Sequence, residues 1–233
     1  MKNTAIFISS TPKYSFIWDT FFTLLRNNWE NCPYPIYFIS TGDTEYLTEK
    51  YNINIEKIEK DLGFLESYRY LCQKYKEKYS HFILLQEDYL IEKKVNQKTL
   101  DEYEKILFEK ENIGFIRTMP CPGPKGEKRR FGDIELRKIN KNEDYSFCFQ
   151  SSFWNLEYFF DFTKIPKNSP SGSENFLAKK MRRCRKKENW GFIRPFKESH
   201  AVYESPIPYR PTAIVKGKLQ GWAKKLIIPK DKC

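Results

Sequence analysis

Two adjacent carboxylates, Glu87 and Asp88, are the residues of this sequence best placed to do chemistry. They directly follow the apolar run at residues 82–85 (FILL) and Gln86, a pattern typical of a strand buried on both faces of a sheet. Because unpaired charges are costly to remove from water, acids at such a strand end need a partner. Ligands bind at the carboxyl ends of strands in open α/β sheets, so we expect a cation or cationic group there. A polar strand end that simply reaches solvent is the alternative.

Glu174 is the second candidate, because it follows a Ser- and Gly-rich loop at the start of a predicted helix. A carboxylate in that position can act as general base on an acceptor hydroxyl. The alternative is structural: Ser171-x-x-Glu174 also fits a capping box, and acids near a helix N-terminus are favourable without any catalytic role.

Two further groups are candidates for ligand binding. His200 is one of 2 histidines and could ligate a metal or transfer a proton, although a hydrogen-bonded structural histidine is the alternative. Asp43 or Asp61, beyond the second predicted strand, could bind a ribose, although a turn explains Asp43 as well.

Alternating strands and helices position these residues in the first half of the chain, as in a parallel α/β sheet. The periodicity predicts strands at residues 4–9, 36–39, 53–58, 82–85 and 113–117, and helices at residues 14–29, 46–50, 61–79 and 99–110, the last capped by Thr99-x-x-Glu102.

The second half is richer in loops. We expect a long loop at residues 119–133, strands at 135–140 and 145–150 that form a hairpin, an aromatic helix at 153–160, a helix from Ser173 through the basic run 179–187, and extended segments at 192–196 and 201–203.

Composition limits the class of protein. The 233 residues suit one large domain, and the net charge of +11 indicates anionic partners. The 6 cysteines are scattered without a close pair, which disfavours a zinc ribbon and fits a reducing cytosol. No run approaches the length of a membrane span, so we expect a cytoplasmic protein, with peripheral contact at the inner membrane face left open.

Taken in order, these motifs resemble those of GT-A glycosyltransferases. Gln86-Glu87-Asp88 resembles the DxD position, and Ser173-Glu174-Asn175 resembles the xED position of the catalytic base. His200 falls where that fold often supplies a metal-ligating histidine, and residues 147–154 and 209–218 resemble its acceptor and closing segments. Two departures stand out: Gln86 replaces the first acid of DxD, and Asn175 replaces the last acid of xED.

The resemblance implies a mixed, Rossmann-like α/β sheet flanked by helices, in a single domain over residues 1–233. Residues 1–118 would bind the nucleotide sugar, and residues 119–233 would form a loop-rich acceptor half with a basic C-terminal segment. The implied activity is transfer of a sugar from a nucleotide donor, with UDP as the expected nucleotide, to a hydroxyl of a surface glycan or lipid-linked acceptor.

The resemblance also implies roles for single residues. Glu174 would be the base of an inverting reaction, and Asp88 with His200 would hold Mn²⁺ or Mg²⁺. The implied donor-binding residues are Ser9, Ser10, Asp43, Glu87, Asp88 and Lys218.

Two rival interpretations come from other classes of protein. A metal-dependent nuclease could use Glu87, Asp88, Glu92 and Lys94, although we expect no nucleic-acid partner. A non-catalytic nucleotide- or glycan-binding module would bind without turnover. The basic run 179–187 could also contact an anionic membrane, for which each cation near the surface contributes about 1 kcal/mol.

Overall fold

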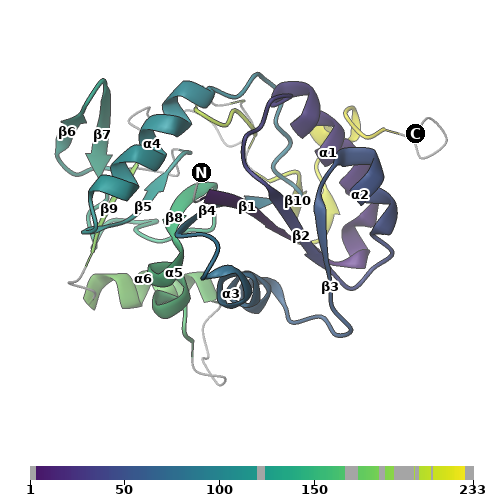
Figure 1. Ribbon diagram of the computed structural model, residues 1–233, viewed down its shortest axis with the longest axis horizontal. Helices are drawn as coiled ribbons and strands as arrows, with labels where there is room; N and C mark the ends of the chain where they lie inside the picture. Colours follow the sequence, from purple (N-terminus) through teal and green to yellow (C-terminus); the bar gives the residue numbers. More distant parts are fainter. Residues whose placement is uncertain are drawn as a thin grey trace.

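The computed structural model describes residues 4–119, 124–165, 173–183, 187–191, 202, 205–210 and 212–228. Its helices and strands are labelled in Figure 1. The strands are β1 (Thr4–Ser9), β2 (Ile36–Ser40), β3 (Asn54–Lys57), β4 (His81–Gln86), β5 (Ile113–Arg117), β6 (Lys128–Phe131), β7 (Ile134–Lys138), β8 (Ser152–Asn155), β9 (Glu188–Gly191), β10 (Ile214–Val215) and β11 (Lys218–Leu219). The helices are the short 3₁₀ helix η1 (Pro12–Tyr14), α1 (Ser15–Asn28), α2 (Glu45–Tyr51), α3 (Phe64–Tyr75), α4 (Gln97–Glu109), α5 (Leu156–Phe162), α6 (Ser173–Arg183) and α7 (Gly221–Lys224).

One mixed sheet of 9 strands runs through the described chain in the order β3-β2-β1-β4-β8-β5-β9-β7-β6. Strands β1 to β4 are parallel to one another, whereas β8 lies antiparallel between β4 and β5. The prediction of a mixed α/β sheet flanked by helices is confirmed. Strands from both predicted halves of the chain join this sheet, since β8 and β9 come from the second half.

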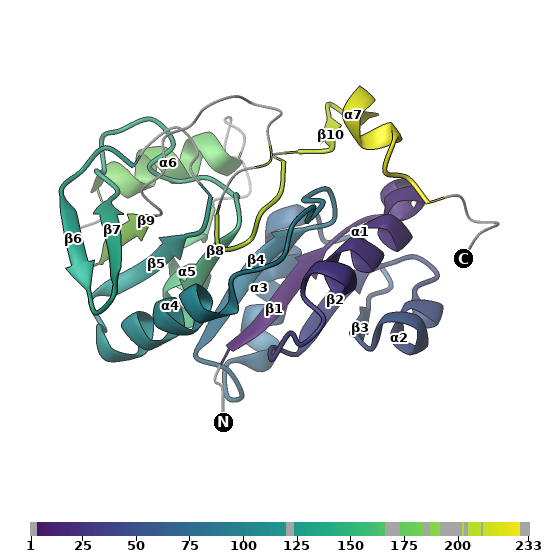
Figure 2. The ribbon, with the colours of Figure 1, turned by 90° about the horizontal axis from the view of Figure 1, so that it is seen from above.

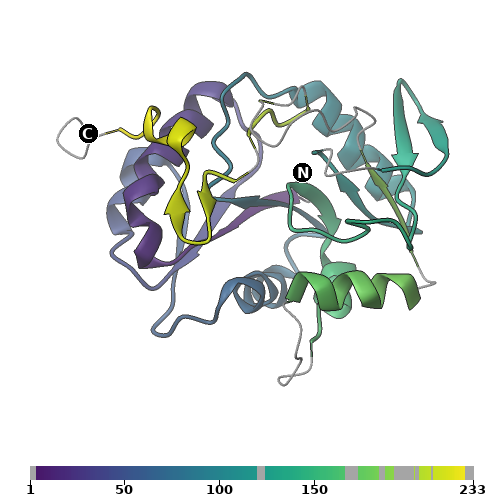
Figure 3. The ribbon, with the colours of Figure 1, turned by 180° about the vertical axis from the view of Figure 1, so that it is seen from behind.

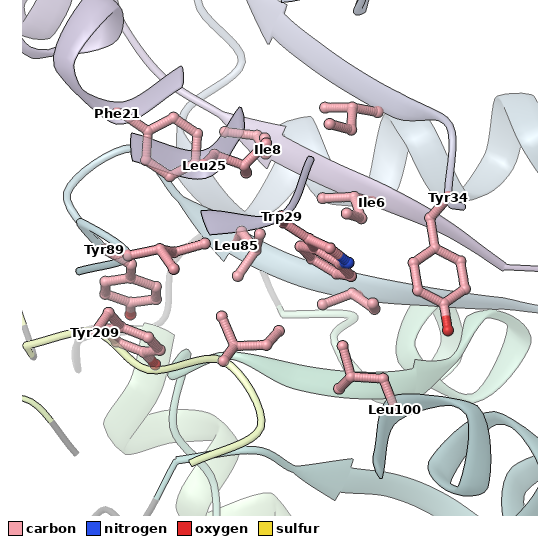
Figure 4. Close-up of a cluster of buried hydrophobic side chains, with 14 of the residues drawn as sticks. Ile6, Ile8, Phe21, Leu25, Trp29, Tyr34, Leu85, Tyr89, Leu100 and Tyr209 are labelled. Carbon is pink, nitrogen blue, oxygen red and sulfur yellow. The ribbon is translucent and has the colours of Figure 1, made fainter. Parts of the chain in front are cut away.

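Both faces of the central strands are buried, as the apolar run in β4 predicts. Ile83 and Leu85 belong to a core cluster with α1 and α4, whereas Phe82 and Leu84 belong to a cluster with α3, α5 and α6. Figure 1 shows these two sets of helices on opposite faces of the sheet, and Figure 4 shows part of the first cluster. Because the sheet is covered on both sides, the chemistry of its polar residues is confined to the strand ends.

The predicted aromatic helix at residues 153–160 is partly wrong. Residues 152–155 form β8, and the helix α5 begins only after Asn155, whose side chain accepts a hydrogen bond of 2.8 Å from the Tyr158 amide. Asparagine is a favoured N-cap because its side chain satisfies a free amide of the first turn. This cap divides one aromatic run into a central strand and a helix.

The predicted loop at residues 119–133 and the predicted hairpin beyond it are also wrong in part. β6 pairs with β7 through the two-residue turn Gly132-Asp133, and residues 145–150 form no strand. Gly132 has a φ of 57°, a conformation that glycine adopts without strain. The Gly-Asp pair between two extended runs is itself a hairpin signal in the sequence.

Two predicted helix boundaries also differ. The helix α3 begins at Phe64 instead of residue 61, because Asp61 accepts a hydrogen bond of 2.7 Å from the Gly63 amide in a turn. The helix α6 ends at Arg183, and residues 184–186 lie outside the described residues.

The N-cap of α4 is Asn96, not the predicted Thr99: the Asn96 side chain accepts a hydrogen bond of 3.1 Å from the Thr99 amide. We expect Asn96→Ala to lower the free energy of unfolding by about 1 kcal/mol, because a cap is lost. Thr99→Ala is the matched control and should change it by less than about 0.5 kcal/mol. Urea unfolding measures both, and equal effects would contradict the assignment.

The C-terminal segment, residues 205–210 and 212–228, returns to the first half of the chain. Arg210 forms an ion pair with Glu92 at 2.7 Å, and the Ile228 amide donates to Thr20 in α1 at 2.9 Å. Figure 2 shows this segment passing from β8 toward α1, and Figure 3 shows the β10–β11 hairpin in yellow beside α1. Among the described helices, none is long and apolar enough to cross a membrane.

Candidate active site

The parallel strands β1 and β4 end side by side, which brings two sequence-predicted residues into contact. Their last residues, Ser9 and Gln86, are partners in the sheet register. One position further along, Ser10 Oγ donates a hydrogen bond of 2.9 Å to Glu87 Oε1. Trp18 Nε1 in turn donates to Ser10 Oγ at 2.7 Å. The Glu87 carboxylate is therefore held on one side by the Ser10 hydroxyl, which in turn accepts from Trp18.

Asp88 is held by the C-terminal segment. Its backbone oxygen accepts from the Ala213 amide at 2.9 Å, and its Oδ2 accepts from the Ile214 amide at 3.4 Å. Its other carboxylate oxygen, Oδ1, is buried and has no hydrogen-bond partner among the described residues. A buried carboxylate oxygen without a hydrogen-bond partner costs free energy, so binding of a proton or a cation to Asp88 would be favourable.

Burial disfavours the ionised form of both carboxyl groups. It raises the pKa of the Glu87 carboxyl to about 8, with a further contribution from the neighbouring Asp88. It raises the pKa of the Asp88 carboxyl to about 7. Strong shifts of this kind are common at functional sites, where a bound cation offsets the cost of the charges.

These acids lie in a cavity of about 350 Å³, here called the strand-end cavity. Its walls come from the ends of β1 and β4, from the start of α3 and from the C-terminal segment. The lining residues are Ser9, Ser10, Thr11, Tyr14, Asp61, Phe64, Gln86, Glu87, Asp88, Thr212, Ile214, Lys216 and Gly217.

A second cavity of about 510 Å³, here called the Glu174 cavity, adjoins the first. Phe64, Gln86 and Thr212 line both cavities. The remaining lining residues are Tyr89, Phe149, Gln150, Glu174 and Asn175. The two adjoining spaces could hold two ligands that meet at the shared wall.

Glu174 projects from the first turn of α6, and its Oε1 accepts a hydrogen bond of 2.9 Å from the Phe149 amide. The carbonyl of Phe149 accepts from Gln86 Nε2 at 3.1 Å and from the Tyr89 hydroxyl at 3.0 Å. Tyr89 stacks on Tyr209 with ring centroids 4.5 Å apart (Figure 4). The backbone of Phe149 thus links Glu174 to the residues at the end of β4.

Not every sequence-predicted residue lies at these cavities. Ser9, Ser10, Glu87 and Asp88 line the strand-end cavity. The turn residue Asp43 and the β11 residue Lys218, both exposed, line neither cavity within the described chain, so their roles stay predictions. His200 lies outside the described residues.

Sequence reasoning missed several residues that line the cavities, above all Phe64, Thr212 and Lys216. Of the two acids predicted as alternatives for ribose binding, Asp43 and Asp61, it is Asp61 that lines the strand-end cavity. No local signal in the sequence shows that the segment at Lys216 and Gly217 reaches the end of β1.

The four residues that the rival nuclease interpretation requires do not lie together at one site. Glu92 pairs with Arg210, and Lys94 Nζ donates to the Asn27 carbonyl at 2.7 Å. Neither side chain joins Glu87 and Asp88 among the residues lining the strand-end cavity.

The acids fit a divalent cation that shares its coordination with phosphate. Mg²⁺ in nucleotide sites is typically held by one or two carboxylates together with phosphate oxygens and water. Within the described residues, no group of three or more His, Cys, Asp or Glu could hold a metal by itself. Asp88, with its orphaned oxygen, suits the shared arrangement, and Glu87 stands next to it.

Comparison with solved structures identifies the fold. TarS of S. aureus superposes with a TM-score of 0.53 at 9% identity, over 83% of this chain and 37% of TarS. A mannosyltransferase from Pyrobaculum calidifontis, solved with GDP-Man and Mn²⁺, gives 0.51 at 8% identity, over 83% of this chain and 55% of that one. The chain has a GT-A-like fold.

The GT-A-like fold extends to nucleotidyl transferases. A cytidylyltransferase from Leptospira borgpetersenii superposes with a TM-score of 0.50 at 12% identity, over 83% of this chain and 77% of that one. No protein-family model and no curated protein sequence matches the chain. At these identities the likeness establishes the nucleotide-sugar transferase-like fold, and the reaction must be argued from the site.

Proposed function

We propose that this protein transfers a sugar from a nucleotide-sugar donor to a hydroxyl group of an acceptor. The observation that carries the proposal is the pair of adjoining cavities, one with the orphaned Asp88 Oδ1 and the other with Glu174. A two-substrate transfer needs two such spaces that meet where the bond is exchanged. The GT-A-like fold supports the same activity.

The nucleotide diphosphate would occupy the strand-end cavity. Asp61 would accept hydrogen bonds from ribose hydroxyls, as strand-end acids do in related nucleotide-binding sheets. Lys216 would lie near the diphosphate, since it lines the same cavity. A divalent cation on Asp88, with Glu87 beside it, would neutralise negative charge on the leaving diphosphate. We propose UDP as the nucleotide and Mn²⁺ or Mg²⁺ as the ion.

The acceptor hydroxyl would enter the Glu174 cavity. Glu174 would take its proton while the acceptor oxygen forms a bond to the anomeric carbon and the bond from that carbon to the diphosphate breaks. Attack from the side opposite the leaving group inverts the configuration. The hydrogen bond from the Phe149 amide holds the carboxylate in place and leaves Glu174 Oε2 to receive the proton.

The acceptor is proposed to be a surface glycan or a lipid-linked sugar at an anionic membrane face. Two described lysines of the basic run 179–187 would contribute little to such contact. Lys180 Nζ donates to the Phe162 carbonyl at 2.5 Å, and Lys187 donates to the Glu111 carbonyl, so both serve the fold. The exposed cations of α6 are Lys179, Arg182 and Arg183.

Ligand-induced stabilisation tests the proposal most directly. A sugar nucleotide present at about 100 times its dissociation constant should stabilise the fold by about 2.7 kcal/mol. We expect a rise in melting temperature with one of the UDP-, GDP-, CMP- and dTDP-sugars, and a larger rise with Mn²⁺ present. Thermal shift measurements across this panel give the answer.

The products of turnover distinguish the competing activities. Sugar transfer releases a nucleoside diphosphate, whereas nucleotidyl transfer from a nucleoside triphosphate releases pyrophosphate. Absence of any thermal shift across the panel would overturn the proposal. Binding without turnover for any acceptor would support a non-catalytic module instead.

A further inference from the structure

Thr212 has an unusual backbone conformation. Its φ is 54°, in the left-handed region, where a β-branched side chain is strained. The other non-glycine residues with positive φ in the described chain are Asn52, Tyr145 and Lys216, none of which is β-branched. Residues in such conformations persist where the surrounding structure fixes them, and they gather at ligand sites.

Contacts on both sides hold Thr212 in this conformation. After it, the Ala213 and Ile214 amides donate to Asp88. Before it, Arg210 makes a two-pronged ion pair with Glu92 at 2.7 and 3.1 Å. The conformation of Thr212 is therefore fixed relative to Asp88, the residue that would approach the diphosphate.

The place of Thr212 is the second observation. It is half-buried and lines both the strand-end cavity and the Glu174 cavity, together with Phe64 and Gln86. If the diphosphate lies in the first cavity and the acceptor in the second, the sugar being transferred must lie at this shared wall. A threonine hydroxyl both donates and accepts hydrogen bonds, which suits a sugar hydroxyl.

Gln86, on the same wall, has less freedom to reorient. Its Nε2 already donates to the Tyr89 hydroxyl at 2.8 Å and to the Phe149 carbonyl at 3.1 Å. Its carbonyl oxygen is the atom it can offer to a ligand, and that atom only accepts. Thr212 is thus the shared-wall side chain that can supply a hydrogen-bond donor.

We propose that Thr212 is a positioning residue for the transferred sugar: its hydroxyl hydrogen-bonds a hydroxyl of that sugar at the wall shared by the strand-end and Glu174 cavities. This inference rests on the proposed function. It names a residue that recognises the sugar separately from the nucleotide, so it concerns which donors the protein accepts.

Three variants distinguish the effect of the Thr212 hydroxyl from the effect of its strained backbone conformation. Thr212→Gly removes both, Thr212→Ala removes the hydroxyl and keeps a Cβ at positive φ, and Thr212→Ser keeps the hydroxyl. We expect Thr212→Gly to raise the melting temperature by a few degrees, because glycine adopts positive φ freely. We expect Thr212→Ala to leave it nearly unchanged.

The deciding measurement is the ratio of two affinities, for the nucleotide sugar and for the matching nucleoside diphosphate, by titration calorimetry. Loss of one hydrogen bond should lower this ratio roughly three- to tenfold in Thr212→Gly and Thr212→Ala. Thr212→Ser should keep it within about twofold of the wild type. A merely structural role would weaken both ligands equally and leave the ratio unchanged.

An unchanged ratio in both the Gly and Ala variants would overturn the inference while leaving the proposed function in place. So would a Ser variant that behaves like Ala. If the wild-type protein binds neither nucleoside diphosphates nor nucleotide sugars, the proposed function is wrong, and the proposed role of Thr212 is wrong with it.

Discussion

Glu174→Gln is expected to reduce sugar transfer by at least about 100-fold, the usual contribution of a general base. Glutamine cannot take the acceptor proton, but its carbonyl oxygen can still accept the hydrogen bond from the Phe149 amide that Glu174 accepts at 2.9 Å. The fold and the affinity for the donor should therefore be preserved. The turnover number with saturating donor and the donor dissociation constant, measured on the same preparation, check both halves of this expectation.

A matched control is available in the neighbouring helix. Glu157 also lies in the first turn of its helix, α5, and lines neither the strand-end cavity nor the Glu174 cavity. Glu157→Gln should leave turnover within about twofold, because exposed substitutions away from the site have small effects. Turnover by Glu174→Gln within tenfold of the wild type would show that Glu174 is only a helix-capping acid.

Asp88→Asn is expected to stabilise the ligand-free protein and to impair donor binding at the same time. The pKa of the Asp88 carboxyl is about 7 in the fold, against an ordinary 3.8. Because the pKa is raised in the folded state, the protonated Asp88 carboxyl contributes its full stabilisation of the fold below about pH 4. This contribution is lost as the pH rises through about 7. Asparagine avoids this loss, so at about pH 8 the variant should gain roughly 4 kcal/mol.

Donor binding should change in the opposite direction. Groups that only support a metal ligand already contribute 10- to 100-fold to affinity, so loss of Asp88 itself should weaken cation-dependent donor binding by about 100-fold. Urea unfolding at about pH 5 and pH 8 and calorimetry with Mn²⁺ and the donor measure the two effects. An Asp88→Asn protein that is less stable at both pH values would contradict the buried-charge account.

The exposed acid Asp133, in the turn between β6 and β7, supplies the control. Asp133→Asn should change stability by less than about 0.5 kcal/mol at either pH, and should leave donor affinity unchanged. A similar gain in both variants would mean that the stabilisation reflects overall charge instead of the buried site.

Local patterns were sufficient to predict the strands and helices of the first half of the chain. Unbroken apolar runs mark β1, β2, β4 and β5, and helical periodicity marks α1, α3 and α4, since each pattern reflects burial on one side or both. The pair of acids after β4 followed from the same reasoning, because carboxylates at the end of a buried strand are costly without a partner. Asp88 was singled out from this pair by its order relative to Glu174 and His200 in the resemblance to GT-A enzymes.

The elements in the second half of the chain were predicted less well, for identifiable physical reasons. The run at residues 153–160 is mostly aromatic and apolar, and short runs of this kind do not distinguish strand from helix. Only the cap at Asn155 decides where β8 ends, and its effect depends on a hydrogen bond that a pattern does not show. The hairpin of β6 and β7 was missed because glycine and basic residues made the segment look like a loop.

The composition of the site was the least predictable part. Thr212 and Lys216 join Asp88 only through long-range contacts, such as the hydrogen bonds from Ala213 and Ile214. No spacing rule connects residues so far apart in the chain. The capping-box pattern likewise suggested a cap for α6 but could not show that Glu174 accepts from the Phe149 amide.

The closure of the strand-end cavity by residues 212–217 has a consequence for biosynthesis. Ser10 and Asp88 lie just beyond the early strands β1 and β4, whereas Thr212 and Lys216, which line the same cavity, are made much later. Domains generally fold as units. Because Asp88 is held by the Ala213 and Ile214 amides, the strand-end cavity is complete only once this segment has been made, so a nascent chain that lacks it should be unable to bind the proposed nucleotide-sugar donor.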